Sequence, residues 1–210
     1  MIPAFPVYLF DVDGTLLNSA ADITGAVREA LAHEGVNGLE QAYLESFIGH
    51  HLFDLFDEVL PHYTRAQHEQ VLAHYRAIYL ARQHANTTVY AGVPEMLAAL
   101  GGRKSTATTK GTDTARNILT QFGLAAHFDH IQGTDGFPSK PAPDVILRSL
   151  EYFGVVPGDC LLIGDAAPDI EAGRRAGVRT CAVRWGYGDQ EAMARLQPDF
   201  WIAHPRELAG

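Results

Sequence analysis

The second half of the chain alternates short apolar runs with helical spacing, and this alternation limits the possible folds more than any other feature of the sequence. The strand-like runs are KSTATTK, FDHIQG, CLLIGD, TCAVRW and DFWIA. Helical spacing begins near Pro94 and recurs over residues 112–122, 143–153 and 168–176. Repeated strand–helix units of this length predict a parallel sheet with helices on both faces. We therefore expect an α/β core.

A further apolar run, Val7 to Phe10, lies near the start of the chain and is typical of a strand buried on both faces. The residues after it show helical spacing over 19–35, 39–48, 52–60 and 64–85, and no strand-like run. We expect an all-helical domain at residues 17–87, inserted directly after the first strand. The α/β core domain then consists of residues 1–16 and 88–210.

The composition argues against several classes of partner. A formal net charge of −9 disfavours nucleic acid and an anionic membrane surface, because both bind basic proteins. No apolar run approaches the length of about 18 residues that a membrane span needs, and we expect no secretion leader. The expected protein is cytoplasmic, monomeric or homodimeric, and its Cys160 and Cys181 are buried reduced thiols.

Acidic residues follow two of the predicted strands. Asp11 and Asp13 come directly after the first strand in DVDGT, and Asp165 and Asp169 follow CLLIGD. In open α/β sheets ligands bind beyond the carboxyl ends of the strands, so the two pairs are expected to converge there. A polar turn at Gly14 would explain the first pair by itself, and a helix cap would explain Asp169. Converging carboxylates favour a Mg²⁺ site instead.

The chain contains only three lysines, Lys104, Lys110 and Lys140, so their positions are informative. Lys110 follows the strand-end residue Thr109. Lys140 lies in PSKPAPD, just before a predicted helix, and would reach the acidic edge of the sheet. There it would offset the charge of the aspartates and of a bound phosphate group.

Four segments in this order, DVDGTL, the strand-end Thr109, SKPAP and GDAAPDI, resemble the four motifs of the haloacid dehalogenase superfamily. The helical insertion after the first motif resembles the cap of the phosphoglycolate-phosphatase-like branch, and RWGYG at residues 184–188 resembles the stretch that follows the fifth strand in that branch. The resemblance spans nearly the whole chain. It implies a Rossmann-like parallel sheet with an inserted all-helical cap domain.

The resemblance also implies roles for individual residues. Asp11 would be the nucleophile that forms an aspartyl-phosphate, and Asp13 would be the general acid and base. Thr109 would bind the transferring phosphoryl group, and Lys140 would orient Asp11. The expected Mg²⁺ ligands are Asp11, Asp13 (through its main-chain oxygen), Asp165 and Asp169, where Asp169 would bind the ion directly or hold its water molecules. The expected substrate-binding residues are Gly49, His50, Thr109, Lys110 and Lys140, with His51 as the alternative to His50.

The expected activity is the Mg²⁺-dependent hydrolysis of a small phosphorylated metabolite, a phosphoglycolate-like phosphomonoester. Dehalogenases of the superfamily lack the second aspartate, and phosphonoacetaldehyde hydrolases need a lysine in the cap, where residues 17–88 have none. A β-phosphoglucomutase-like phosphotransferase, a pyrophosphatase and a catalytically silent binding module stay open as alternatives. Lys110 and Ala166 differ from the Asn and the Thr or Ser that the family often has at these positions.

Overall fold

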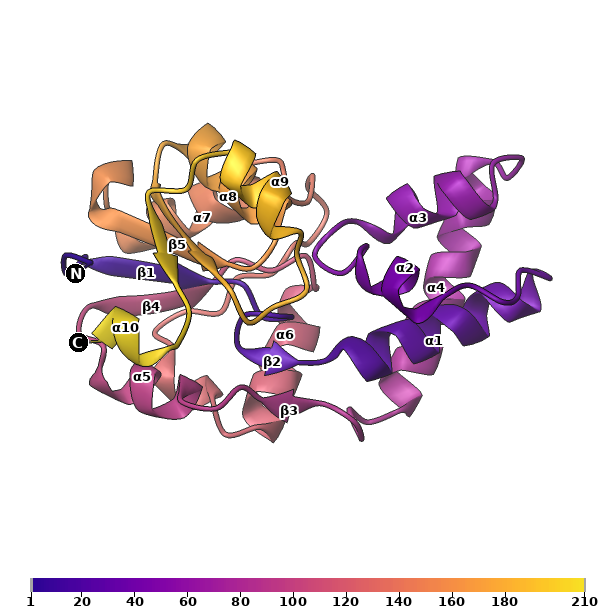
Figure 1. The fold of residues 1–210 in the computed structure, drawn as a ribbon, viewed down its shortest axis with the longest axis horizontal. Helices are drawn as coiled ribbons and strands as arrows, with labels where there is room; N and C mark the ends of the chain where they lie inside the picture. Colours follow the sequence, from indigo (N-terminus) through magenta and orange to yellow (C-terminus); the bar gives the residue numbers. More distant parts are fainter. Residues whose placement is uncertain (1, 210) are drawn as a thin grey trace.

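The computed structural model describes residues 2–209 and shows a five-stranded parallel sheet at the centre of an α/β core (Figure 1). The strand order is β4-β1-β5-β6-β7, and every neighbouring pair runs parallel. The strands are β1 (Val7–Phe10), β4 (Arg103–Thr106), β5 (Cys160–Gly164), β6 (Arg179–Val183) and β7 (Phe200–Ile202). The predicted α/β fold with a Rossmann-like parallel sheet is confirmed.

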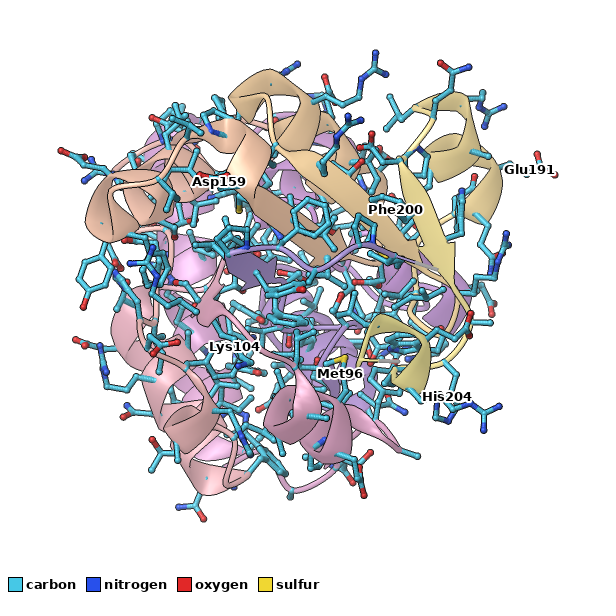
Figure 2. All side chains as sticks on the ribbon, turned by 90° about the vertical axis from the view of Figure 1, so that its left-hand side faces the viewer. Met96, Lys104, Asp159, Glu191, Phe200 and His204 are labelled. Atoms are coloured by element: carbon cyan, nitrogen blue, oxygen red, sulfur yellow. The ribbon has the colours of Figure 1, made fainter. Side chains whose placement is uncertain are left out.

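Helices cover both faces of this sheet because successive strand side chains point to opposite sides. From β1, Tyr8 and Phe10 pack in one buried cluster, and Val7 and Leu9 pack in another. The first cluster includes side chains of α5 and α6, among them Met96, which Figure 2 labels, and the second includes side chains of α7 and α8. The core helices are α5 (Val93–Ala99), α6 (Thr112–Gln121), α7 (Asp144–Phe153), α8 (Ala167–Ala176), α9 (Gln190–Arg195) and α10 (Arg206–Ala209).

One predicted strand, FDHIQG at residues 128–133, is wrong. This segment lies beside β4, where Asp129 N and His130 N both donate to Lys104 O at 3.0 and 3.2 Å, and side chains make the remaining hydrogen bonds in place of a full ladder. The Thr106 hydroxyl accepts from Gln132 N and donates to Gln132 O, both at 2.9 Å. The Asp129 carboxylate accepts from Lys104 N at 2.8 Å. The apolar pattern therefore identified a segment that buries Ile131 but did not identify its hydrogen bonding.

The helical segment packs around its own buried cluster, on the right-hand side of Figure 1. Its helices are α1 (Ala20–His33), α2 (Gln41–Glu45), α3 (Leu52–Val59) and α4 (Arg65–Ala81). The cluster includes Ala26 from α1, Leu44 from α2, Phe56 from α3 and Val71 from α4, so the buried faces of the four helices converge on each other. This separate core supports the expected cap domain, while the boundaries at residues 17 and 87 stay a prediction. Within residues 2–209, no helix is long and apolar enough to cross a membrane.

Two short strands join the helical segment to the core, and the sequence analysis missed them. β2 (Leu17–Asn18) and β3 (Thr88–Val89) pair antiparallel, at the entry and the exit of the segment. Next to them, the buried Asp22 carboxylate accepts from the backbone and side-chain nitrogens of Asn86 at 2.9 and 3.0 Å, and from the Thr87 hydroxyl at 2.7 Å. A strand of two residues is too short to produce an alternating pattern.

Asp22→Asn is expected to destabilise the protein by about 2 kcal/mol at pH 7, since a charged acceptor of three hydrogen bonds is lost. Burial alone would raise the pKa of Asp22, but the hydrogen bonds from Asn86 and Thr87 hold it below its ordinary value. A carboxylate of lowered pKa stabilises the fold above its unfolded pKa, and this contribution disappears as the pH falls through the folded pKa. The difference in unfolding free energy between wild type and variant, measured in urea, should therefore begin to shrink below about pH 4 and disappear only below the folded pKa. A constant difference between pH 7 and pH 3.5 would contradict this account.

Candidate active site

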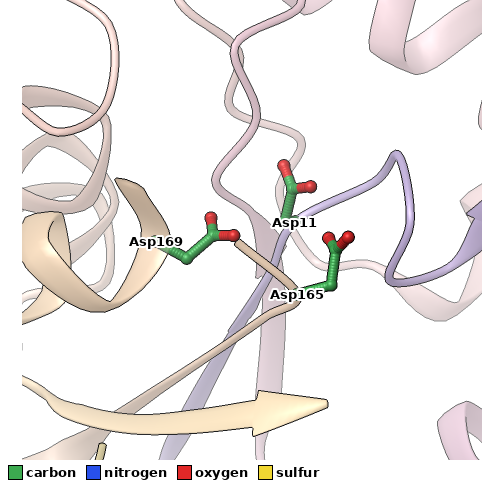
Figure 3. Close-up of side chains that lie close together, drawn as sticks. All are labelled: Asp11, Asp165 and Asp169. Atoms are coloured by element: carbon green, nitrogen blue, oxygen red, sulfur yellow. The ribbon is translucent and has the colours of Figure 1, made fainter. Parts of the chain in front are cut away.

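Three carboxylates meet at the carboxyl edge of the sheet, as the sequence predicts. Asp11 follows β1, Asp165 follows the neighbouring strand β5, and Asp169 lies in the first turn of α8 (Figure 3). One oxygen from each carboxylate lies within 4.8 Å of the others, and all three residues are buried. Parallel pairing of β1 with β5 brings the first two acids together, and the turn into α8 adds the third.

Lys140 supplies a positive charge to two of these acids. Its Nζ donates to Asp11 Oδ1 at 2.7 Å and to Asp169 Oδ1 at 2.5 Å, and the side chain is almost completely buried. The other oxygen of Asp169, Oδ2, accepts from Ala166 N at 3.1 Å, so Asp169 also caps its helix. The predicted approach of Lys140 to the acidic edge is therefore present, and its contact leaves Oδ2 of Asp11 outside the ion pair.

Asp165 has no positively charged partner among residues 2–209. Its carboxylate accepts from the Thr15 hydroxyl at 3.1 Å and from Tyr187 N at 2.9 Å. Burial raises the pKa of Asp165 well above its ordinary value, and the nearby Asp11 and Asp169 add to the shift. Burial also raises the pKa of Asp11 to about 7, although Lys140 opposes it. Three acids with one lysine thus have a deficit of positive charge, and hard oxygen donors of this kind fit a divalent cation.

Glycines let the backbone close around this acid group. Gly14 has φ +84°, a conformation that L side chains rarely adopt, and a methyl group there would collide with the Asp165 carboxylate. A methyl group at Gly186 would collide with the same carboxylate. Asp13 lies just before this turn, close enough to Asp11 for its carboxylate to raise the pKa of Asp11.

Asp13 makes a separate set of contacts. Its Oδ1 accepts from the Ser19 hydroxyl at 2.6 Å, and its Oδ2 lies 2.9 Å from Lys110 Nζ. Lys110 also donates to the Tyr79 hydroxyl on α4 at 3.0 Å and lies over the ring of that tyrosine. Burial alone would lower the pKa of Lys110, but the Asp13 carboxylate raises it well above its ordinary value. The Asp13 side chain thus lies outside the three-acid group, and the contact of its main-chain oxygen with Mg²⁺ stays a prediction.

A cavity of about 180 Å³ opens beside Asp13, between the helical segment and the core. It brings together the predicted residues Gly49, His50, Thr109 and Lys110. Its other lining residues include Ile23, Phe47, Ile48, His51, Leu52, Leu72, Tyr75, Arg76, Tyr79, Leu80 and Thr114. The predicted residues therefore form two adjoining parts, the buried acid group with Lys140 and the cavity that begins at Asp13.

The turn at residues 49–51 distinguishes the two predicted histidines. His51 Nδ1 accepts from Phe53 N at 3.2 Å at the start of α3, and burial lowers the pKa of His51, which favours this neutral acceptor. His50 Nδ1 lies 3.8 Å from the Asp54 carboxylate and is partly exposed. Gly49 has φ +90°, and a methyl group there would lie 3.0 Å from the side chain of Ala166. This turn therefore rests on the loop that follows Asp165, and His50 is the histidine without a capping contact.

Tyr187 is a site residue to which the sequence analysis gave no role. Its backbone N–H donates to Asp165, and its hydroxyl accepts from Ser19 N at 2.7 Å and Ala20 N at 3.1 Å and donates to Asn18 at 2.7 Å. It therefore joins the acid group to the start of α1. The segment RWGYG drew attention to this stretch through its resemblance only. Nothing in the spacing indicated these contacts.

The arrangement defines a class of protein: an α/β fold whose buried carboxylates and lysine meet beyond the ends of parallel strands. The sequence model of the haloacid dehalogenase-like hydrolase family matches residues 8–183. The chain belongs to this family.

Known relatives agree with this assignment. A phosphoglycolate phosphatase of Aquifex aeolicus is 34% identical over 206 residues, which cover 96% of this chain and 94% of that protein. A 5'-nucleotidase of Pseudomonas aeruginosa is 32% identical over 203 residues, which cover 95% of this chain and 91% of that protein. The crystal structure of a predicted phosphatase from Clostridium acetobutylicum has a TM-score of 0.91 and 28% identity, and the match covers 99% of this chain and 97% of that one. The protein is an enzyme of the phosphatase type.

Proposed function

We propose that the protein hydrolyses a small phosphomonoester in a Mg²⁺-dependent reaction, through an aspartyl-phosphate on Asp11. The contact that supports this most is the Lys140 ammonium on Asp11 Oδ1, which leaves Oδ2 for attack on phosphorus. A phosphoglycolate-like substrate agrees with the name of the Aquifex aeolicus relative. A cytoplasmic location and a monomeric or homodimeric state remain predictions.

The reaction proceeds in two displacements. Asp11 Oδ2 forms a bond to phosphorus, the bond from phosphorus to the leaving oxygen breaks, and that oxygen takes a proton from Asp13. A water molecule then attacks phosphorus, gives its proton to Asp13, and frees Asp11 and inorganic phosphate. Lys140 contacts Asp11 and Lys110 contacts Asp13, so both lysines offset negative charge during these steps. Thr109 hydrogen-bonds the phosphoryl group. Phosphoryl transfer depends mainly on such positioning and neutralisation.

Asp11, Asp165, Asp169 and the main-chain oxygen of Asp13 would hold Mg²⁺, directly or through water. The ion supplies the positive charge that lets a carboxylate approach a phosphate dianion. The deficit of positive charge at Asp165 supports this role. Tyr187 and Thr15 hold the Asp165 carboxylate by hydrogen bonds and fix its orientation toward Asp11.

Three alternatives differ in what the cavity accepts or in whether the acids act at all. A phosphotransferase of the β-phosphoglucomutase type and a pyrophosphatase would use the same acids on other substrates. A silent binding module has no need for the complete set of Asp11, Asp13, Asp165 and Lys140. The connected, buried arrangement of this set disfavours a silent module.

Phosphate release from a panel of compounds tests the proposal. The panel contains 2-phosphoglycolate, pyrophosphate, a hexose phosphate, a nucleoside 5'-monophosphate and p-nitrophenyl phosphate. We expect hydrolysis of at least one monoester with Mg²⁺ and loss of nearly all activity with excess EDTA, restored by added Mg²⁺. Full activity after exhaustive chelation would overturn the metal assignment. Absence of hydrolysis throughout the panel would favour a silent module.

A further inference from the structure

Both carboxylate oxygens of Asp13 are held in place, each by a different residue. Oδ1 accepts from the Ser19 hydroxyl at 2.6 Å, and Oδ2 lies 2.9 Å from Lys110 Nζ. The side chains of Asp13 and Lys110 are each only 9% exposed, so little water competes for the contact between them. Asp13 is the general acid of the proposed function, on which this inference rests. Its orientation therefore depends on where the Lys110 ammonium group lies.

Lys110 has a second contact that fixes the position of its ammonium group. A lysine side chain is a flexible stem that samples many conformations, so a single ion pair leaves its end mobile. Lys110 Nζ also donates to the Tyr79 hydroxyl at 3.0 Å and lies 4.5 Å from the centre of the Tyr79 ring. An ammonium group has three N–H donors, so one donor stays available for the substrate while two bind Asp13 and Tyr79. Tyr79 therefore holds Lys110 against Asp13.

The Tyr79 ring is itself held by its neighbours. It is buried, stacks on the Tyr75 ring at 5.8 Å with an angle of 19°, and makes an edge contact with the His84 ring at 5.1 Å. Burial raises the pKa of Tyr79, although Lys110 opposes the shift, so the hydroxyl keeps its proton and accepts through a lone pair. Tyr79 lies on α4, whereas Lys110 follows the core strand β4. The helical segment thus reaches the general acid through this hydroxyl and Lys110.

We infer that Tyr79 is a positioning residue for Asp13: it holds Lys110 where this lysine orients the carboxyl group for protonation of the leaving oxygen. Within residues 2–209 no hydrogen bond joins Tyr79 to Asp13, so Tyr79 acts through Lys110. Lys110 does not block the proton transfer, because a protonated carboxyl group keeps acceptor capacity beside the proton that it donates.

The effect of such a residue depends on how much the leaving oxygen needs a proton. The alkoxide of benzyl phosphate is a poor leaving group unless it is protonated, whereas p-nitrophenolate leaves without a proton. The ratio kcat/KM covers the steps up to the transfer of the phosphoryl group to Asp11, before Asp13 acts as a base on water. A comparison of kcat/KM between these two esters therefore isolates the general-acid step.

Tyr79→Phe tests the inference, since it keeps the ring and removes only the hydroxyl. It should lower kcat/KM for benzyl phosphate on the order of tenfold, which is part of the roughly 10²- to 10⁴-fold that general acid catalysis contributes. The value for p-nitrophenyl phosphate should change less than about twofold, because its leaving group needs no proton. Lys110→Met should lower the benzyl value at least as much. Adding Tyr79→Phe to Lys110→Met should cause no further loss, because the two residues act in series.

Tyr63→Phe is the matched control. It removes another tyrosine hydroxyl of the helical segment that makes one hydrogen bond, at 2.9 Å from Glu34, and Tyr63 does not line the cavity beside Asp13. It should leave kcat/KM for both esters unchanged. If benzyl phosphate loses no more than p-nitrophenyl phosphate in Tyr79→Phe, the inference is overturned and the proposed phosphatase stands. If the wild type hydrolyses neither these esters nor any other monoester, the proposed function itself fails.

Discussion

Asp11→Asn is expected to reduce turnover by on the order of 10⁴-fold or more and to abolish phosphoenzyme formation. The amide is a poor nucleophile and a weaker ligand for a cation, and it also loses the ion pair with Lys140 at 2.7 Å. Steady-state phosphate release measures the first effect. Acid quenching after mixing with labelled substrate, followed by detection of protein-bound phosphate, measures the second.

Asp159→Asn is a suitable control for this experiment. Asp159 precedes β5, at the opposite end of the strand from Asp165. The variant should retain normal turnover and normal phosphoenzyme. A phosphoenzyme that still accumulates in Asp11→Asn would assign the nucleophile to another residue.

Lys140→Met is expected to destabilise the metal-free protein by about 3–5 kcal/mol, because it leaves two buried carboxylates without their cation. Lys140 Nζ lies 2.7 Å from Asp11 and 2.5 Å from Asp169. All three side chains are buried, so water does not solvate the carboxylates once the lysine is lost. Added Mg²⁺ should raise the melting temperature of the variant more than that of wild type, since a bound cation replaces part of the missing charge. Denaturant unfolding and a Mg²⁺ titration of the melting temperature provide the two measurements.

Lys104→Met is the control that distinguishes the loss of ion pairs with carboxylates from the loss of any buried lysine side chain. Lys104 is also buried, but within residues 2–209 its Nζ donates to Gly102 O at 3.2 Å and forms no ion pair. Its replacement should be far less destabilising, and Mg²⁺ should not rescue it. The double variant with Asp11→Asn should recover part of the stability lost in Lys140→Met, because one of the unpaired charges is removed. A metal-free Lys140→Met as stable as wild type would contradict the charge argument.

The acid group could be predicted because its position follows from topology. Once Asp11 and Asp165 were placed at the ends of parallel strands, the sheet required them to meet at one edge. The scarcity of lysine made Lys140 a clear partner. The fold class followed in the same way from the alternation of strands and helices.

The aromatic residues of the site could not be predicted, because they fit the pattern of a buried helix face equally well. Tyr75 and Tyr79 occur at the spacing of an amphipathic helix, and only the structure shows that Tyr79 contacts Lys110. Tyr187 binds through its backbone N–H, which any residue possesses. Contacts of this kind depend on the relative placement of two packed bodies, and local spacing contains no information about that placement.

The ribbon formed by β2 and β3 has an evolutionary consequence. Because Leu17 pairs with Val89 and Asn18 pairs with Thr88, the chain leaves the core and returns to it at one point. Segments whose ends lie side by side can be exchanged, shortened or extended with little effect on the scaffold that holds them. The helical segment is in this sense an interchangeable module. Selection can rebuild the walls around the leaving group, residue by residue or as a whole, while the strands that present the aspartates keep their geometry.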